Sequence, residues 1–324
     1  MRCILDKMLF AKAAVRAGLA VLPSWDARSG DGLEALAPTL PYPILIKPRT
    51  HVHRLLTDKG IVVHSASKLI QQYRRIVGSE QHQADDYAPL PNAGFPILQQ
   101  FVDVGSEGVH SVTGFIDRTG ELFVTRQSRK VFLRSRPVGI GICFESQPAS
   151  AALSRAVRHL CRELGYFGVF EVELVRFGEG WAAIDFNPRF YHQMGMDIRR
   201  GMPLPLLAYL DATGQTAQLR IAVARAQQDE VADVVFQDRF TLALKLFADS
   251  ITARISGADR AYWRAWIKKN AARAVDVAAD PSDPAPGIVH ALSEIQLGLK
   301  AIPRFLRSPS PMAAVTTGLY TEAL

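Results

Sequence analysis

The stretch EVELVRFGEGWAAIDFNPR, residues 171–189, has the pattern of a β-hairpin with acidic side chains near its open end. Apolar and polar residues alternate on both sides of a Gly-Glu-Gly segment, which is typical of two antiparallel strands joined by a short turn. If residues 178–180 form a three-residue turn, residues equidistant from Glu179 oppose each other. Glu173 then pairs with Asp185, and Glu171 pairs with Asn187.

This register places four oxygen-bearing side chains on one face of the hairpin. Side chains repeat every second residue along a strand, and directly opposed Cβ atoms lie roughly 4.5–5.5 Å apart. A glycine bulge would shift the register by one residue, so the pairing is a hypothesis. The other face carries an apolar set that we expect to pack into the core: Val172, Leu174, Ile184 and Phe186.

The three carboxylates of this face predict a metal site. Like charges at this spacing destabilise a sheet or raise one another's pKa, and a divalent cation that prefers hard oxygen ligands would relieve the repulsion. Magnesium is the expected ion, because it keeps part of its water shell and combines one or two carboxylates with substrate phosphates. On pattern alone, a polar and solvated hairpin face is an equally good interpretation.

The rest of the chain alternates helical and strand patterns. Helices are predicted over residues 6–18, 67–78 and 148–165, strands over 42–48 and 96–102, and a second hairpin over 110–127 with its turn at 117–120. Residues 79–96 lack periodicity and predict a long surface loop. From about residue 200 the pattern is mostly helical, including 239–251 and 261–275, with a last helix starting near Ile288. This order predicts an α+β core with a helical C-terminal extension.

Composition argues against several classes of protein. The 324 residues are 48% hydrophobic, no apolar run reaches the roughly 18 residues of a membrane span, and the N-terminus lacks a signal-peptide pattern. Three scattered cysteines, Cys3, Cys143 and Cys161, indicate neither a disulfide framework nor a zinc site, so we expect a cytoplasmic protein without a membrane partner. The net charge of +7 is spread along the chain, which disfavours a nucleic-acid partner.

One basic segment, RQSRKVFLRSR at residues 126–136, contains no acidic residue. It suits a phosphate or carboxylate ligand, and it is equally compatible with a solvated strand and loop.

In several segments the chain resembles the ATP-grasp enzymes, in particular the branch similar to D-aspartate ligases and the carbamoyl phosphate synthetases. The hairpin resembles the magnesium-binding hairpin of that family, since a Glu is followed twelve residues later by a second acid and then by Asn-Pro-Arg. LDKMLFAKAAVRAG resembles the family's opening helix, YPILIKP the strand with a phosphate-binding lysine, and ILQQFV the linker between lobes. RQSRKVFLRSRPVGIGICFESQP is similar to a stretch with an Arg-Lys pair that ends in Glu-Ser. The resemblance spans about residues 4–210.

This resemblance implies an ATP-grasp fold with two α+β lobes that grip ATP. The first lobe would comprise residues 1–98, the second lobe with the metal site residues 99–210, and the helical C-terminal extension residues 211–324. The family usually has a small α/β domain before the Asp-Lys helix, and only five residues precede Asp6 here. We therefore expect a misplaced start of the reading frame, impaired activity, or a separate chain or homodimer partner that supplies this domain.

The resemblance also implies roles for individual residues. Lys47 would bind the α- and β-phosphates with support from Lys7, and Glu107 would bind the ribose hydroxyls. One or two magnesium ions, or manganese in their place, would bind Glu173, Asp185 and Asn187. The adenine edge would be read by backbone groups of the linker residues Gln100, Phe101, Val102 and Asp103. The transferred phosphoryl group or the acyl phosphate would be neutralised by three basic side chains, Arg129, Lys130 and Arg189.

The function implied is an ATP- and magnesium-dependent ligase that activates a small-molecule carboxylate as an acyl phosphate and joins it to an amine. Such chemistry needs positioning and charge neutralisation more than a protein nucleophile. The alternatives are a nucleotide-binding pseudoenzyme or partner subunit without turnover of its own, and a helical adaptor that binds no ATP. His192, just past Arg189, could contact substrate, although a lone loop histidine is more often structural.

Overall fold

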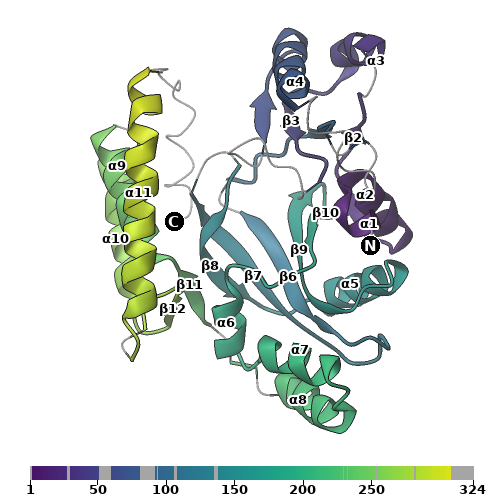
Figure 1. Cartoon of the computed structure of the whole chain (residues 1–324), viewed down its shortest axis with the longest axis vertical. Helices are drawn as coiled ribbons and strands as arrows, with labels where there is room; N and C mark the ends of the chain where they lie inside the picture. Colours follow the sequence, from purple (N-terminus) through teal and green to yellow (C-terminus); the bar gives the residue numbers. More distant parts are fainter. Residues whose placement is uncertain are drawn as a thin grey trace.

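The chain folds into two antiparallel-rich sheets of different size, with helices packed around them (Figure 1). The computed structural model describes residues 2–27, 30–50, 60–80, 92, 94–105, 108–134, 138–228, 230, 231, 233–252, 254–280 and 282–307. Within these ranges, no helix is both long and apolar enough to cross a membrane. The expected loop at 79–96 falls largely outside the described residues.

The smaller sheet has four strands in the order β2-β5-β3-β4. Its central strands are β5 (Ile97–Gln100) and β3 (Ile44–Lys47), flanked by β2 (Ser24–Trp25) and β4 (Ile61–Val63). Helices α3 (Gly30–Leu36) and α4 (Ala66–Glu80) and the 3₁₀ turn η1 (Ala37–Thr39) accompany it. Ile44, Ile46, Leu69 and Leu98 form a separate core for this lobe.

The larger sheet has eight strands in the order β1-β10-β9-β6-β7-β8-β11-β12. Its middle is a run of antiparallel strands that contains both predicted hairpins. β1 pairs in parallel with β10 at one edge, and β12 pairs in parallel with β11 at the other. The eight strands are β1 (Ala20–Val21), β6 (Val109–Ile116), β7 (Phe123–Leu133), β8 (Gly141–Gln147), β9 (Gly168–Phe177), β10 (Gly180–Asn187), β11 (Val235–Gln237) and β12 (Ala274–Asp276).

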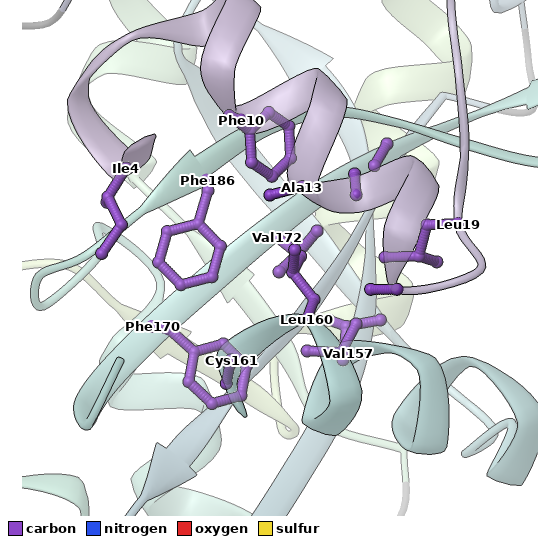
Figure 2. Close-up of a cluster of buried hydrophobic side chains, with 14 of the residues drawn as sticks. Ile4, Phe10, Ala13, Leu19, Val157, Leu160, Cys161, Phe170, Val172 and Phe186 are labelled. Atoms are coloured by element: carbon purple, nitrogen blue, oxygen red, sulfur yellow. The ribbon is translucent and has the colours of Figure 1, made fainter. Parts of the chain in front are cut away.

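Helices cover both faces of the larger sheet. On one face, α2 (Lys7–Arg16) and α5 (Ala151–Glu163) enclose the core drawn in Figure 2, where Phe10 and Val157 meet Phe170, Val172 and Phe186 of the hairpin. On the other face, α6 (Met194–Arg199), α7 (Leu204–Ala212) and α8 (Thr216–Gln228) follow the hairpin, and α7 and α8 pack on β6, β7 and β9. We call this second surface the α6 face. The short α1 (Arg2–Leu5) leads into α2.

The ends of α2 follow the prediction of a helix over residues 6–18. Asp6 accepts hydrogen bonds from the backbone of the first turn of α2, and Gly18 follows the helix with φ +83°, a conformation that favours glycine. Ser150 caps α5 in the same way. The end predicted at Gly78 for the helix over 67–78 was wrong, because α4 continues to Glu80.

The C-terminal extension contains strands as well as helices. α9 (Arg239–Ile251), α10 (Gly257–Asn270) and α11 (Ala285–Arg307) stand together beside β8, β11 and β12 (Figure 1). The helix predicted over 261–275 ends at Asn270, because residues 274–276 instead pair in parallel with β11. Similarly, β1 of the predicted first lobe belongs to the large sheet. The domain boundaries at 98 and 210 remain predictions.

We predict that Phe170→Ala lowers the free energy of unfolding by about 3–5 kcal/mol, because Phe170 is fully buried and stacks between Phe123 and Phe186. Urea titration followed by circular dichroism measures this loss. Phe167→Ala is the matched control: Phe167 is 53% exposed, so its loss should cost about 1 kcal/mol or less. Equal losses in the two variants would contradict the core assignment.

Candidate functional site

The hairpin β9–β10 carries the predicted oxygen-bearing side chains in the predicted pairs. Glu173 opposes Asp185 and Glu171 opposes Asn187. The expected three-residue turn was wrong, however, since Phe177 already pairs with Gly180 across a two-residue turn. The pairing is restored by a bulge at Ile184, which lies between the pairs Ala183–Leu174 and Asp185–Glu173.

The bulge determines the face of the sheet to which the side chains at the end of β10 point. In the register set by the two-residue turn, Asp185 would oppose Val172 and share the core face. One extra residue reverses the facing of every later side chain in the strand, so Asp185 and Asn187 join Glu173 and Glu171 on the α6 face. Ile184 was expected in the opposite core and instead packs in a cluster with Leu22.

Glu173 and Lys130 form a buried ion pair at the centre of this face. Lys130 Nζ lies 2.6 Å from Glu173 Oε1, and the side chains are 4% and 9% exposed. Burial alone would lower the pKa of Lys130, but Glu173, Glu171 and Asp185 outweigh it and raise the pKa above its ordinary value. The charged form of Lys130 is therefore favoured, and the burial of both side chains excludes a solvated hairpin face.

Glu171 is held by three uncharged donors. Its carboxylate accepts hydrogen bonds from Ser111 Oγ at 2.8 Å, Gln193 Nε2 at 2.7 Å and Asn187 Nδ2 at 2.9 Å. The bond from Asn187 fixes its amide so that Oδ1 faces away from Glu171 and toward Arg189 Nη2, 3.5 Å distant. Glu171 thus orients a predicted metal ligand. Sequence reasoning missed Ser111 and Gln193, although Ser111 lies on β6 opposite Glu173.

Two lysines approach the hairpin from the N-terminal half of the chain. Lys47, at the end of β3 and buried, donates from Nζ to the Ile184 carbonyl at 3.0 Å. Lys7, in the first turn of α2, places Nζ 3.6 Å from Asp185 Oδ1. The bulge therefore provides an acceptor that faces the smaller sheet, and the repulsion predicted among the carboxylates is offset by Lys7 and Lys130.

The linker segment predicted to read adenine lies between the two sheets. The backbone N–H groups of Gln100 and Phe101 donate to Pro23 and Pro43 inside the smaller lobe, at 2.9 and 3.1 Å. Val102 packs in the Ile184 cluster, and Asp103 accepts a hydrogen bond from the Gly105 backbone. Glu107, the predicted ribose ligand, lies outside the described residues.

Arg129 does not join the group around Glu173. Consecutive residues of a strand point to opposite faces, so Lys130 faces Glu173 while Arg129 leaves β7 on the side of α2 and α5. There its guanidinium contacts Glu145 Oε2 at 2.8 Å, and Glu145 Oε1 also accepts from Trp266 Nε1 at 2.7 Å. Arg189 stays near Asn187 and is exposed. Of the three predicted catalytic side chains, the structure gathers Lys130 and Arg189.

The donor set on the α6 face fits magnesium shared with a phosphate. Glu173 and Asp185 are directly paired and offer hard oxygen donors, while Asn187 presents Nδ2 to Glu173 at 3.5 Å and would offer Oδ1 from the side of Arg189. Within the described residues, no three His, Cys, Asp or Glu side chains form a metal-binding group by themselves. Magnesium commonly takes only one or two carboxylates and completes its shell with water and substrate oxygens, so a group of three is not required.

The fold of this chain is that of solved ATP-grasp structures. The biotin carboxylase domain of Hydrogenobacter thermophilus 2-oxoglutarate carboxylase, in complex with MgADP, ADP and bicarbonate, is 12% identical with a TM-score of 0.51 over 71% of this chain and 46% of its own. A biotin carboxylase–β-γ-ATP complex from Campylobacter jejuni is 14% identical with a TM-score of 0.53, over 72% of this chain and 49% of its own.

Pyruvate carboxylase from Rhizobium etli is similar as well, at 14% identity and a TM-score of 0.53, over 72% of this chain and 19% of its own. The chain thus spans about half the length of the first two structures it matches. No protein-family model and no curated protein matches the sequence. The likeness confirms the predicted ATP-grasp fold.

We predict that the contact between Arg129 and Glu145 stabilises the fold and takes no part in the site on the α6 face. Burial would raise the pKa of Glu145, but hydrogen bonds from Trp266 and Arg129 outweigh it and lower the pKa below 4.5. A lowered folded-state pKa means that the stabilisation is complete above the unfolded value and is lost as the pH falls through the folded value. Glu145→Gln should therefore cost about 1–3 kcal/mol at pH 7.

Urea titration of the unmodified protein and of Glu145→Gln, from pH 7 down to pH 3, measures the two free energies of unfolding. The difference should shrink as the medium is acidified. Glu179→Gln, in the exposed hairpin turn, is the control and should change stability by about 0.5 kcal/mol or less at every pH. A cost of Glu145→Gln that is the same at pH 3 and pH 7 would refute the charged contact.

Proposed function

We propose that this protein is an ATP- and magnesium-dependent ligase that activates a small-molecule carboxylate as an acyl phosphate and joins it to an amine. The observation that carries the proposal is the convergence of Lys47, Lys7 and Lys130 on the oxygen donors of one hairpin. Cations beside such a donor group match a ligand that brings both phosphate charge and a divalent ion. The ATP-grasp fold supports the same conclusion, since a similar structure holds MgADP and bicarbonate.

The nucleotide would lie between the two sheets. Lys47 and Lys7 would bind its phosphates, because both reach the hairpin from the smaller lobe and its neighbouring helix. The linker from Gln100 to Asp103 would read the adenine edge. Since the N–H groups of Gln100 and Phe101 are bonded within the lobe, we assign this reading to their carbonyl groups and to residues 102–103. Glu107 remains our proposed ribose ligand.

Magnesium would be held by Glu173, Asp185 and Asn187, with Asn187 oriented by Glu171. The ion would draw the β- and γ-phosphates together and offset the charge that develops during transfer. Glu173 can contact Lys130 and also bind a metal ion, because a carboxylate offers about four lone-pair sites on its two oxygens. Titration with magnesium and with manganese counts the ions bound.

Lys130 and Arg189 would neutralise the transferred phosphoryl group. Three carboxylates raise the pKa of Lys130 above its ordinary value, which favours the charged form that this role needs. Arg189 is exposed and lies beside Asn187, where it could meet a substrate carboxylate with two N–H groups. We leave Arg129 out of this set, because it occupies the other face of the sheet.

We predict that Lys47→Met weakens Mg-ATP binding about 10- to 100-fold, because hydrogen bonds to charged groups contribute roughly 1.5–3 kcal/mol. Isothermal titration with Mg-ATP, and again with ATP plus a chelator, measures this. Lys12→Met, on the exposed side of α2, should bind like the unmodified protein. Binding that is equal in the two variants, or independent of magnesium, would refute the assigned site.

Turnover separates a ligase from a protein that only binds nucleotide. ADP release should require a carboxylate and an amine together, and a panel of amino acids and related acids would identify the pair. Mg-ATP binding without ADP release for any pair would instead favour a nucleotide-binding partner subunit. The absence of any nucleotide binding would favour a structural adaptor.

A further inference from the structure

The α6 face continues from the proposed phosphate site into the C-terminal extension. Lys130 of β7 pairs with Phe144 of β8, and Phe144 pairs with Phe236 of β11. These three residues form one cross-strand row on the same face. Lys130 Nζ lies 5.9 Å from the Phe144 ring centroid, and the Phe144 and Phe236 centroids are 5.8 Å apart. Both rings are 1% exposed and pack with Met196 and Val234, so a buried aromatic row joins Lys130 to the C-terminal extension.

His192 lies at the far end of this row. Its ring meets Phe236 edge-on with centroids 5.2 Å apart, and solvent reaches it. The segment that carries it, between the hairpin and α6, also supplies Gln193 to Glu171. His192 therefore lies at the exposed end of the row that begins at Lys130, and it is the sequence neighbour of the residue that binds Glu171.

The C-terminal extension places a histidine and a carboxylate at the end of β11, the strand that carries Phe236, and both act electrostatically on His192. His290 Nε2, from α11, lies 3.0 Å from Asp238 Oδ1. Asp238 is 3% exposed and caps α9 through a hydrogen bond from the Thr241 backbone, so its position is fixed from two directions. A carboxylate that holds one imidazole nitrogen fixes the orientation of the ring. The N-cap of α9 and a residue of α11 thus meet at a His–Asp pair.

We propose that His192, His290 and Asp238 form the amine end of the ligase site, with His192 as the general base for the attacking amine and His290 and Asp238 as positioning residues. This inference rests on the proposed function. The amine nitrogen bonds to the carbonyl carbon of the acyl phosphate, the bond from that carbon to the phosphate oxygen breaks, and orthophosphate leaves with the electron pair. The proton lost by the nitrogen passes to an imidazole nitrogen of His192.

The electrostatic surroundings keep His192 able to accept this proton. Partial burial is the main cause, and it lowers the pKa of His192. The negative charges of Asp238 and Glu171 raise this pKa, and the positive charges of His290 and Lys130 lower it. The net direction is downward, so the neutral form prevails at pH 7. A neutral imidazole at pH 7 can accept the one proton that a neutral amine loses as its nitrogen bonds to the carbonyl carbon.

The expected variant is His192→Asn, which removes the base and keeps a similar size. Amide formation should fall about 10²- to 10⁴-fold in kcat, while the Kd for Mg-ATP stays within twofold. The loss of rate on the acid side of the wild-type pH profile should also disappear. His159→Asn, on the exposed side of α5, is the matched control and should leave all three quantities unchanged.

Hydroxylamine separates the base from the other parts of the site. It is unprotonated at neutral pH and traps an acyl phosphate as a hydroxamate without needing a base. His192→Asn should therefore make hydroxamate at nearly the wild-type rate. His290→Gln should shift the acid limb of the amine profile without changing hydroxamate formation, an effect that a purely structural role would not produce.

The outcomes distinguish the two levels of the proposal. If the wild-type protein forms hydroxamate and His192→Asn forms the amide at the wild-type rate, His192 is not the base and only this inference fails. If the variant loses hydroxamate and amide formation equally, His192 supports the site as a whole and the inference also fails. If the wild-type protein forms neither product with any carboxylate, the proposed function fails, and the inference that rests on it falls with it.

Discussion

The candidate site depends on one extra residue in β10. A two-residue turn starts the hairpin in a register that would send Asp185 and Asn187 into the apolar core, and the bulge at Ile184 reverses their facing. The same bulge presents the Ile184 carbonyl to Lys47 of the smaller sheet. A single backbone irregularity therefore assembles the oxygen donors and connects them to the other lobe.

Local rules predicted a large part of the fold. Asp6 marks the start of α2, and the alternation in residues 171–189 identifies the hairpin, because capping and period-two patterns are set by neighbours in sequence. The turn length was wrong because Gly178-Glu179-Gly180 suits both two- and three-residue turns. The bulge was unpredictable, since Ile184 has no feature that favours one, and the predicted pairs are correct because these two differences cancel.

The site is less predictable than the fold, because its contacts join distant segments. Glu171 receives donors from Ser111 and Gln193, which lie 60 and 22 residues away. One signal was present in the sequence and unused: Arg129 and Lys130 are consecutive residues of a strand, so only one of them could reach the carboxylates. β11 and β12 have three residues each, too few for a period to be recognised, and their pairing with the large sheet depends on tertiary contacts.

The contact between Lys47 and the Ile184 carbonyl has a thermodynamic consequence. If phosphate oxygens take this ammonium group, they must replace a hydrogen bond that the chain already makes within itself, at 3.0 Å. The affinity that Lys47 adds is then the difference between a bond to a charged phosphate and a bond to a neutral carbonyl, and the cost of dehydrating a buried lysine has been met during folding. When Lys47 exchanges the Ile184 carbonyl for a phosphate oxygen, its charge stays buried. Lys47 therefore connects the two lobes in both states, through the backbone or through the ligand.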